Sequence, residues 1–187
     1  MGIHSDNARE RIIDAAEQVV IEAGARHLTL AAVASKAGVS RGGLLYHFPY
    51  KEDLLRGMMD RRRTHMMERR KTRMALTPQG PEREAVAYVL SLLGDHTDAN
   101  TNISAAIIAA GAHDPKLLAP VKKNNLQTIT DLTRDGLSFE RAAVILLAAN
   151  GLRFFEVLSM SSFSAKERGK IIDELLALAK ENKGHKG

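Results

Sequence analysis

The sequence contains no cysteine and no tryptophan, and aromatic residues make up only 4% of its 187 positions. Without cysteine there is no disulfide framework, no thiolate metal site and no thiol nucleophile. The segment 1–11 lacks the apolar run of a signal peptide, and no later stretch approaches the ~20 apolar residues that a membrane span needs. We therefore expect a soluble, cytoplasmic protein that has no membrane partner.

Basic residues exceed acidic residues by five, and the excess is confined to the first part of the chain. Residues 1–75 hold 14 Lys and Arg against 9 Asp and Glu, whereas residues 76–187 hold 13 of each kind. Such asymmetry indicates a polyanionic partner for the N-terminal segment. A basic face that is merely solvated would give the same count, so charge alone leaves both interpretations open.

Apolar residues recur at helical spacing in the N-terminal segment, and no stretch of the chain has the pattern of a strand. A first helix is expected over residues 7–23. Thr29 can cap a second helix that ends at Gly38. Ser40 can cap a third helix, which stops before Pro49 because proline disfavours helical geometry in the residue that precedes it. Two short helices therefore flank a Gly-Val-Ser turn.

A long helix is expected to follow from Lys51 to about Ala75, where a cluster of proline and glycine at residues 77–81 ends it. The domain boundary is placed inside this helix, between residues 55 and 56. Further helices are expected at residues 82–93, 102–112, 115–134, 139–159 and 165–181. The whole chain is thus predicted to be all-α.

The two short helices meet the requirements of a helix-turn-helix. This motif needs a small residue where its helices cross, a permissive glycine at the turn, and apolar residues that hold both helices on the first helix. These requirements are met by Ala34, Gly38, Val39, Leu44 and Leu45. The second helix of the motif would then present its first turn to the major groove of DNA.

The residues expected to face the bases are Ser40, Arg41, Gly42 and Gly43. Arg41 can make a bidentate contact to guanine, worth about 1–3 kcal/mol of discrimination. The two glycines allow close approach of the backbone, although each costs the helix roughly 1 kcal/mol relative to alanine. Phosphate contacts are expected at the rim from Thr29, Tyr46, His47 and Lys51. The alternatives are a core position for Tyr46 and a solvated position for His47.

The segment from about Asn7 to Leu55 resembles the DNA-binding domain of the TetR/AcrR family of bacterial repressors. The resemblance is carried by Leu28-Thr29-Leu30, Val33-Ala34, the run Ala37-Gly38-Val39-Ser40-Arg41-Gly42-Gly43-Leu44-Leu45-Tyr46-His47-Phe48-Pro49, Lys51 and Leu54-Leu55. It implies that the DNA-facing positions of the family are Thr29, Ser40, Arg41, Gly43, Tyr46, His47 and Lys51, and that Phe48 is a buried anchor. The chain departs from the family at Val20, where an aromatic residue is usual, and at Tyr50, where a small capping residue is usual.

The resemblance also implies a function for the remainder of the chain. Residues 1–55 would form a three-helix DNA-binding domain, and residues 56–187 a helical ligand-binding and dimerisation domain. The last two helices would pair with those of a second subunit in a homodimer. That dimer would repress transcription at a pseudo-palindromic double-stranded DNA operator and release it when a small-molecule effector binds.

Polar residues within apolar runs are the candidates for an effector pocket: His96, Asn102, His113, Asn124, Asn125, Asn150 and Arg153. A position at a helix end or on the surface is the alternative for each. Asn150 is favoured because it is an amide inside the small, apolar run Ala148–Leu152, and a buried amide needs partners. The basic residues between Arg61 and Arg73 are expected to form a solvated face that pairs with acidic residues after Pro81.

Two other classes of protein compete with a specific repressor. A helical-bundle enzyme has little support, because no Glu-x-x-His or His-Glu-x-x-His spacing suggests a metal site, and we expect neither metal nor cofactor. A non-specific architectural DNA-binding protein would lose affinity uniformly without Arg41, whereas a specific repressor would lose discrimination at one base pair.

Overall fold

The computed structural model describes residues 3–80, 82–94 and 98–180, and helices are the only regular secondary structure in this part of the chain. The all-α class expected from the sequence is confirmed. In chain order the elements are α1 (Ile3–Ala23), η1 (Ala25–His27), α2 (Leu30–Ala37), α3 (Arg41–His47), α4 (Lys51–Leu76), α5 (Arg83–Leu93), α6 (Asp98–His113), η2 (Pro115–Leu118), α7 (Ala119–Arg134), α8 (Phe139–Val157) and α9 (Ala165–Lys180).

Most element boundaries follow the sequence pattern, with three notable differences. Helix α6 begins at Asp98 rather than at residue 102. The first helix begins at Ile3 rather than at residue 7, so Asn7 lies inside α1. The expected helix over residues 115–134 is divided into the 3-10 turn η2 and the helix α7.

The helices pack into two compact units. The first unit contains Met1–Thr64 and Thr97–Leu117, and the second contains His65–His96 and Leu118–Gly187. Helix α4 contributes residues to both. This division by packing differs from the functional division into residues 1–55 and 56–187, which remains a prediction.

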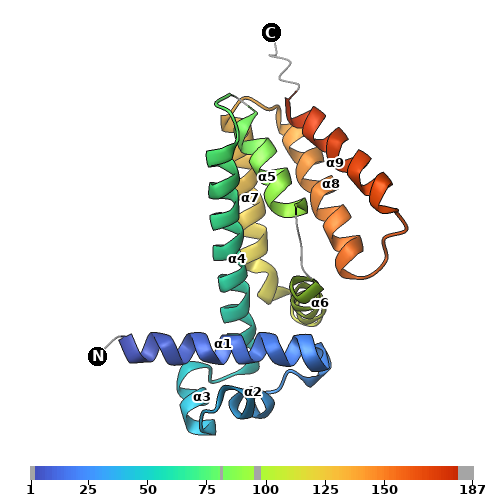
Figure 1. Ribbon diagram of the computed structural model, residues 1–187. Coiled ribbons are helices and arrows are strands. Elements are labelled where there is room, and N and C mark those ends of the chain that lie inside the picture. The colour runs from blue at the N-terminus through green and yellow to red at the C-terminus, as the bar shows by residue number, and fades with distance from the viewer. Residues whose placement is uncertain (1–2, 81, 95–97, 181–187) are drawn as a thin grey trace. The chain divides into compact units, whose positions relative to one another are not determined.

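In the first unit, α2 packs against α1 and α3 packs against α2, and Figure 1 shows both short helices on the same side of α1. Helix α6 also packs against α1. The shared core is apolar, and its fully buried large side chains are Ile12, Ile13, Val20, Leu28, Val33, Leu44, Leu54 and Met58. The smaller Val20, at the position where the family usually has an aromatic residue, is thus a core residue.

The predicted caps of α2 and α3 are confirmed. Thr29 Oγ1 accepts a hydrogen bond from the Ala32 amide at 3.1 Å, and Ser40 Oγ accepts one from the Gly43 amide at 3.0 Å. Gly38 ends α2 in the left-handed conformation with φ of 64°, which glycine adopts without steric cost. These local bonds set the turn and with it the direction of α3.

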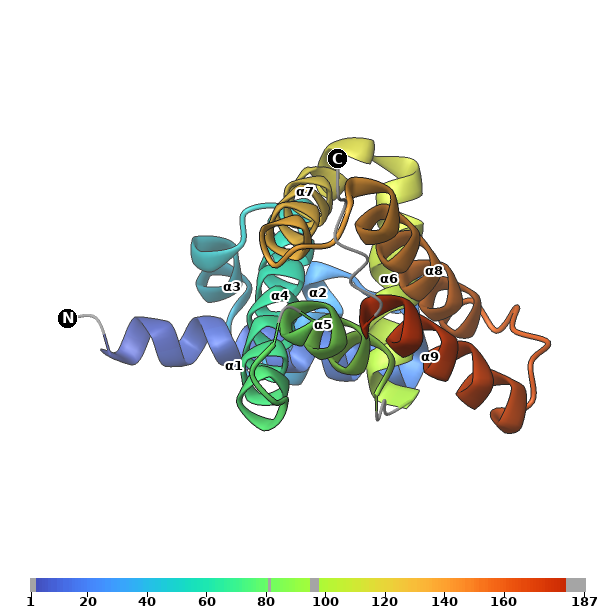
Figure 2. The same cartoon turned by 90° about the horizontal axis from the view of Figure 1, so that it is seen from above.

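The second unit is a bundle in which α5 packs against α7, α8 and α9. Figure 2 looks down on these helices and shows α5 between α4 and α9. The eight buried residues among the eleven of α5 reflect this central position. Within the described ranges, no helix combines the length and apolar character required to cross a bilayer.

Candidate nucleic-acid interface and effector site

The first turn of α3 is an open surface in the first unit. Arg41, Gly42 and Gly43 are exposed, and a Cβ built on Gly42 would have no heavy atom within 4 Å. A Cβ on Gly43 would lie 3.3 Å from Ser40 Oγ, the atom that caps the helix. The backbone of this turn is therefore accessible, with the Arg41 side chain at its leading end.

The rim residues predicted to contact phosphate are also accessible. Tyr46 is 80% exposed, so the alternative of a core aromatic is wrong for this residue. Its ring meets that of His47 edge-on with centroids 5.1 Å apart, while His47 itself is half-buried. Thr29 and Lys51 are exposed at the beginnings of α2 and α4. All four rim residues and the first turn of α3 thus belong to the first unit, and their contact with DNA remains a prediction.

Phe48 lies beneath this surface as the resemblance implies. It is 2% exposed and belongs to the core of the first unit. The guanidinium carbon of Arg9 lies 5.3 Å from the centroid of its ring, within the range of a cation–π contact. The end of α3 is therefore fixed to the core while its beginning faces solvent.

Only the returning half of a capping box is present at the start of α4. Tyr50 cannot cap α4 as a serine or threonine would, but its backbone N–H donates to Asp53 Oδ2 at 3.2 Å. This is the returning half of a capping box, in which the third helical residue accepts from the cap. Asp53 also pairs with Arg56 Nη1 at 2.9 Å.

Gly57 allows α4 to approach α1 and α3 closely. A Cβ on this residue would lie 2.9 Å from Phe48 Cε1 and 3.3 Å from Ile13 Cδ1. This role was not predicted from the sequence, although a glycine in the middle of a long helix is a usable signal because it costs stability there.

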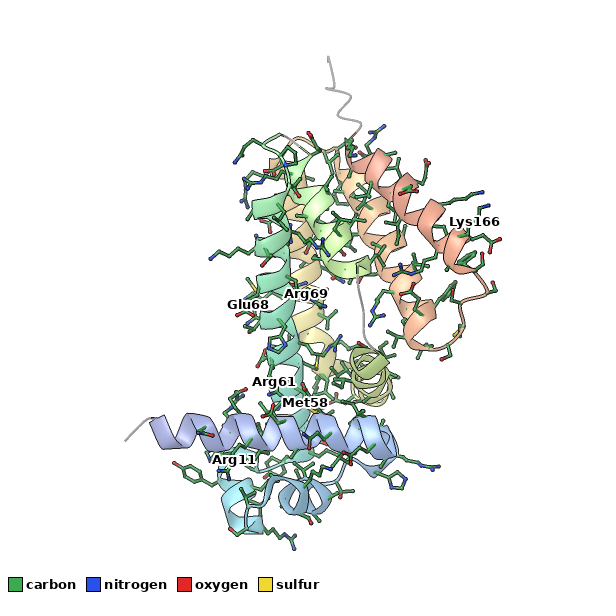
Figure 3. All side chains as sticks on the ribbon, viewed as in Figure 1. Arg11, Met58, Arg61, Glu68, Arg69 and Lys166 are labelled. Atoms are coloured by element: carbon green, nitrogen blue, oxygen red, sulfur yellow. The ribbon has the colours of Figure 1, made fainter. Side chains whose placement is uncertain are left out.

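Arg61, one turn after Gly57, ties the same helix to α1. Its guanidinium pairs with the carboxylates of Asp14 at 2.5 Å, Glu17 at 3.0 Å and Glu10 at 3.4 Å. The side chain is only 12% exposed. Figure 3 labels it on α4 beside α1. The expectation that Arg61 belongs to a solvated face is therefore wrong, because the acidic face of α1 packs against it.

Arg70, in the second unit, does pair as expected with an acidic residue after Pro81. Its Nη2 lies 2.6 Å from Glu84 Oε2. The Arg70 side chain is only 17% exposed, so the prediction of a solvated position is wrong for this residue. The guanidinium also lies 5.6 Å from the ring centroid of Tyr88. Helix α4 is thereby joined to α5 inside the second unit.

Three of the effector-site candidates lie wholly or partly outside the described residues. His96 lies outside the described residues, and so do the side chains of Asn102 and His113. Asn124 is half-buried on α7 and makes no hydrogen bond or ion pair with Asn150 or Arg153 among the described residues. The neighbouring Asn125 lines a shallow groove of about 350 Å³ along α7, together with Leu118, Val121, Lys122, Leu126 and Ile129.

Asn150 and Arg153 lie three residues apart on α8 and therefore share one face of that helix. Asn150 Nδ2 donates to the Tyr88 hydroxyl at 2.7 Å and to the Leu146 carbonyl at 2.8 Å. Burial raises the pKa of Tyr88 to about 12, and the hydrogen bond from Asn150 and the charge of Arg70 offset only part of that effect. The tyrosine therefore stays protonated in neutral solution, and its hydroxyl hydrogen is available to an acceptor.

Arg153 lies in a group of charges rather than on the surface. Its side chain is 11% exposed, and its Nη1 lies 3.6 Å from Glu156 Oε2. Glu156 also pairs with Arg168 Nε at 2.5 Å, and Arg168 Nη2 donates to the Leu93 carbonyl at 2.7 Å. Burial lowers the pKa of Arg153, although the nearby Glu156 acts in the opposite direction. Of the described residues, no three His or carboxylate side chains gather as a metal site would require.

Two family profiles match this chain. The family described as "Bacterial regulatory proteins, tetR family" matches residues 12–58. The one described as "Tetracyclin repressor-like, C-terminal domain" matches residues 82–180, more than half of the chain. The two matches cover the helix-turn-helix and most of the second unit.

Curated relatives and solved structures are similar over much of the chain. The HTH-type transcriptional regulator BetI of Serratia proteamaculans is 31% identical over 150 residues, which are 77% of this chain and 74% of that protein. The HTH-type transcriptional regulator SrpR of Pseudomonas putida is 33% identical over 116 residues, 61% of this chain but only 52% of that relative. The crystal structure of a transcriptional regulator from Rhodococcus sp. Rha1 has a TM-score of 0.72 and 23% identity, covering 91% of this chain and 95% of that one.

Proposed function

Because this chain belongs to the TetR family of bacterial transcriptional regulators, and is therefore a DNA-binding regulator rather than an enzyme, we propose that it is a repressor released by a small molecule. It binds a pseudo-palindromic operator as a homodimer. An effector bound in the second unit lowers its affinity for that operator. The observation that carries the proposal is the open first turn of α3, where Arg41 is the leading side chain.

The DNA contacts divide into two kinds in this proposal. Arg41 reads a base pair, most naturally guanine, while Gly42 and Gly43 let the backbone approach the groove. Contacts to phosphate come from Thr29, Tyr46, His47 and Lys51. Ser40 faces the groove with Arg41; it uses an oxygen lone pair for its cap and keeps its hydroxyl hydrogen for an acceptor on the DNA.

Homodimerisation is supported by apolar side chains on the outer face of α8. Leu147 is 68% exposed, Val144 52% and Phe155 42%, on a helix whose opposite face is buried against α5 and α7. Exposed apolar side chains that share one face of a helix are typical of a protein interface. The second copy of α8 and α9 is its occupant in this proposal, as the family resemblance implies.

Coupling between effector and operator is assigned to α4. This helix belongs to both units, and in the first unit Gly57 and Arg61 hold it against α1 and the end of α3. A ligand that binds one arrangement of α4 better than another shifts the population toward that arrangement. The groups proposed to meet the ligand are Asn150 and Arg153, while His96, Asn102, His113 and Asn124 remain weaker candidates.

The proposal is tested by selecting duplexes from a random library with the purified protein and measuring binding to the enriched sequence by fluorescence anisotropy. A specific repressor should prefer the selected duplex over random competitor by about 10³-fold or more at physiological salt. The selected sequence should contain two half-sites related by a two-fold axis. An architectural protein would bind selected and random duplexes equally, which would refute the proposal.

A further inference from the structure

Around Glu156 in the second unit, the described arginine side chains outnumber the described carboxylates. Arg153 and Arg168 share the single carboxylate of Glu156, and their side chains are 11% and 33% exposed. Arg69 of α4, labelled in Figure 3, adds a third guanidinium close enough to repel Arg153 electrostatically. Three cations therefore face one anion among the described residues of this region.

Arg69 shows most directly that a partner is needed. Its Nε is inaccessible to solvent and has no hydrogen-bond partner among the described residues. A buried donor without a partner is rare in folded proteins, and a charged one is especially unfavourable because it has lost its hydration. Its neighbour Glu68 on α4 is exposed and does not serve this role.

The geometry of these groups selects an oxyanion. A guanidinium presents Nε and one Nη as a planar fork, which matches the two oxygens of a carboxylate. A cationic effector would be repelled, and a neutral one would leave the excess of charge unchanged. An anion placed beside Arg69 and Arg153 would satisfy the orphaned donor and offset the repulsion between them.

The surroundings indicate that the anion carries an apolar body. One turn from Arg153 on α8, the Asn150 side chain meets Tyr88, and Tyr88 belongs to the apolar cluster that includes Leu92 and Leu152. The Tyr88 hydroxyl hydrogen and Asn150 Oδ1 have no partner among the described residues. They offer one donor and one acceptor to the far end of a ligand.

We propose that the effector is a small organic carboxylate whose anionic group binds Arg69 and Arg153 and whose body lies toward Tyr88 and Asn150. The inference rests on the proposed function, since it names the chemical class of the effector that is proposed to bind in the second unit. It predicts that affinity depends on the charge of the ligand more than on its shape.

The experiment measures binding to the full-length protein by titration calorimetry and by the shift in melting temperature, with benzoate, phenylacetate and octanoate as probes. Each is compared with its uncharged amide and with inorganic phosphate at equal ionic strength. We expect saturable binding of at least one carboxylate and at least tenfold weaker binding of its amide, a ratio on the order of that for a charge-assisted hydrogen bond. The inference is overturned if no carboxylate binds below about 50 mM, or if amide or phosphate binds equally well.

Variants locate the site. Arg69→Gln and Arg153→Gln should each weaken carboxylate binding by about tenfold or more. Arg69→Lys keeps the charge but loses the fork, so it should give an intermediate loss. Lys71→Gln removes the same charge from an exposed position on the same helix and should leave binding within about twofold. Unchanged binding in Arg69→Gln, with the melting temperature confirming a folded protein, would disprove the assignment.

A parallel measurement of operator binding separates this inference from the proposed function. Carboxylate binding that depends on Arg69 but leaves operator affinity unchanged would support the site and refute release by this ligand. Release of the operator by a neutral or cationic molecule, unaffected by Arg69→Gln, would refute the carboxylate site and support a ligand-responsive repressor.

Discussion

Gly57 of α4 lies so close to Phe48 that a Cβ on the glycine would be 2.9 Å from Cε1 of the phenyl ring. Phe48 is 2% exposed and cannot move aside without disturbing the core of the first unit. The glycine thereby sets how closely α4 approaches the end of the candidate reading helix.

Gly57→Ala is therefore expected to destabilise the protein, although alanine favours a helix. The gain in helix propensity is about 1 kcal/mol, whereas overpacking a core costs typically 1–3 kcal/mol. Chemical denaturation followed by circular dichroism measures the net change in the free energy of unfolding. A variant more stable than the wild type would show that the side chains of Phe48 and Ile13 can shift to accommodate the added methyl group.

Gly42→Ala provides the opposite case, because a Cβ there meets no heavy atom within 4 Å. We expect this variant to be more stable by up to about 1 kcal/mol and to bind the selected operator at least tenfold more weakly, since the methyl group occupies space needed for the groove. Gly169→Ala, in α9, also meets nothing within 4 Å and serves as the comparison for the gain in stability alone, because α9 belongs to the proposed dimer interface. Unaltered operator affinity in Gly42→Ala would contradict close backbone approach.

Replacing Arg41 or Lys51 by alanine is expected to weaken DNA binding in two different ways. Arg41→Ala should lose about 1–3 kcal/mol of discrimination at one base pair of each half-site. Lys51→Ala should weaken all duplexes alike and reduce the slope of log affinity against log salt by about 1. Binding to a panel of single-base operator variants over a range of salt concentrations distinguishes the two patterns. A uniform loss in Arg41→Ala would favour a non-specific DNA-binding protein.

Leu147→Glu is expected to separate the proposed homodimer. Leu147 is 68% exposed in the single chain, and a carboxylate there would be desolvated in the interface, raising the dimer dissociation constant by about a hundredfold. Sedimentation velocity measures the mass, and operator affinity should fall in parallel. Leu126→Glu on α7 is the control, because Leu126 is 63% exposed on a helix outside the proposed interface. Equal effects of both variants would argue against α8 as the contact.

Tyr88→Phe is expected to change how stability depends on alkaline pH. The ordinary pKa is 10.0 and the folded value about 12, so above pH 10 the unfolded chain releases a proton that the folded chain retains. Stability should therefore fall between pH 10 and pH 12 by roughly 1.4 kcal/mol per pH unit, in addition to the effect of other groups. Denaturation curves of wild type and Tyr88→Phe over this range give the difference. Parallel pH profiles would show that the hydroxyl is not held in its neutral form.

The sequence by itself determined the helix-turn-helix, because its specification is local. The caps of α2 and α3 join residues only three apart, Thr29 to Ala32 and Ser40 to Gly43, and Gly38 adopts its turn by its own conformational freedom. The all-α class follows in the same way from periodicity within each helix.

Only the tertiary structure decided which charges and amides meet. Arg61 pairs with carboxylates 44 to 51 positions away, and Asn150 reaches Tyr88 across 62 positions. Helical periodicity tells which side of a helix is apolar, but it does not tell which other helix will pack there. For this reason the basic residues between Arg61 and Arg73 were predicted to be solvated, although part of that run is buried. Burial and pairing are properties of the packed chain, and they decide whether an arginine is a surface charge or part of a binding site.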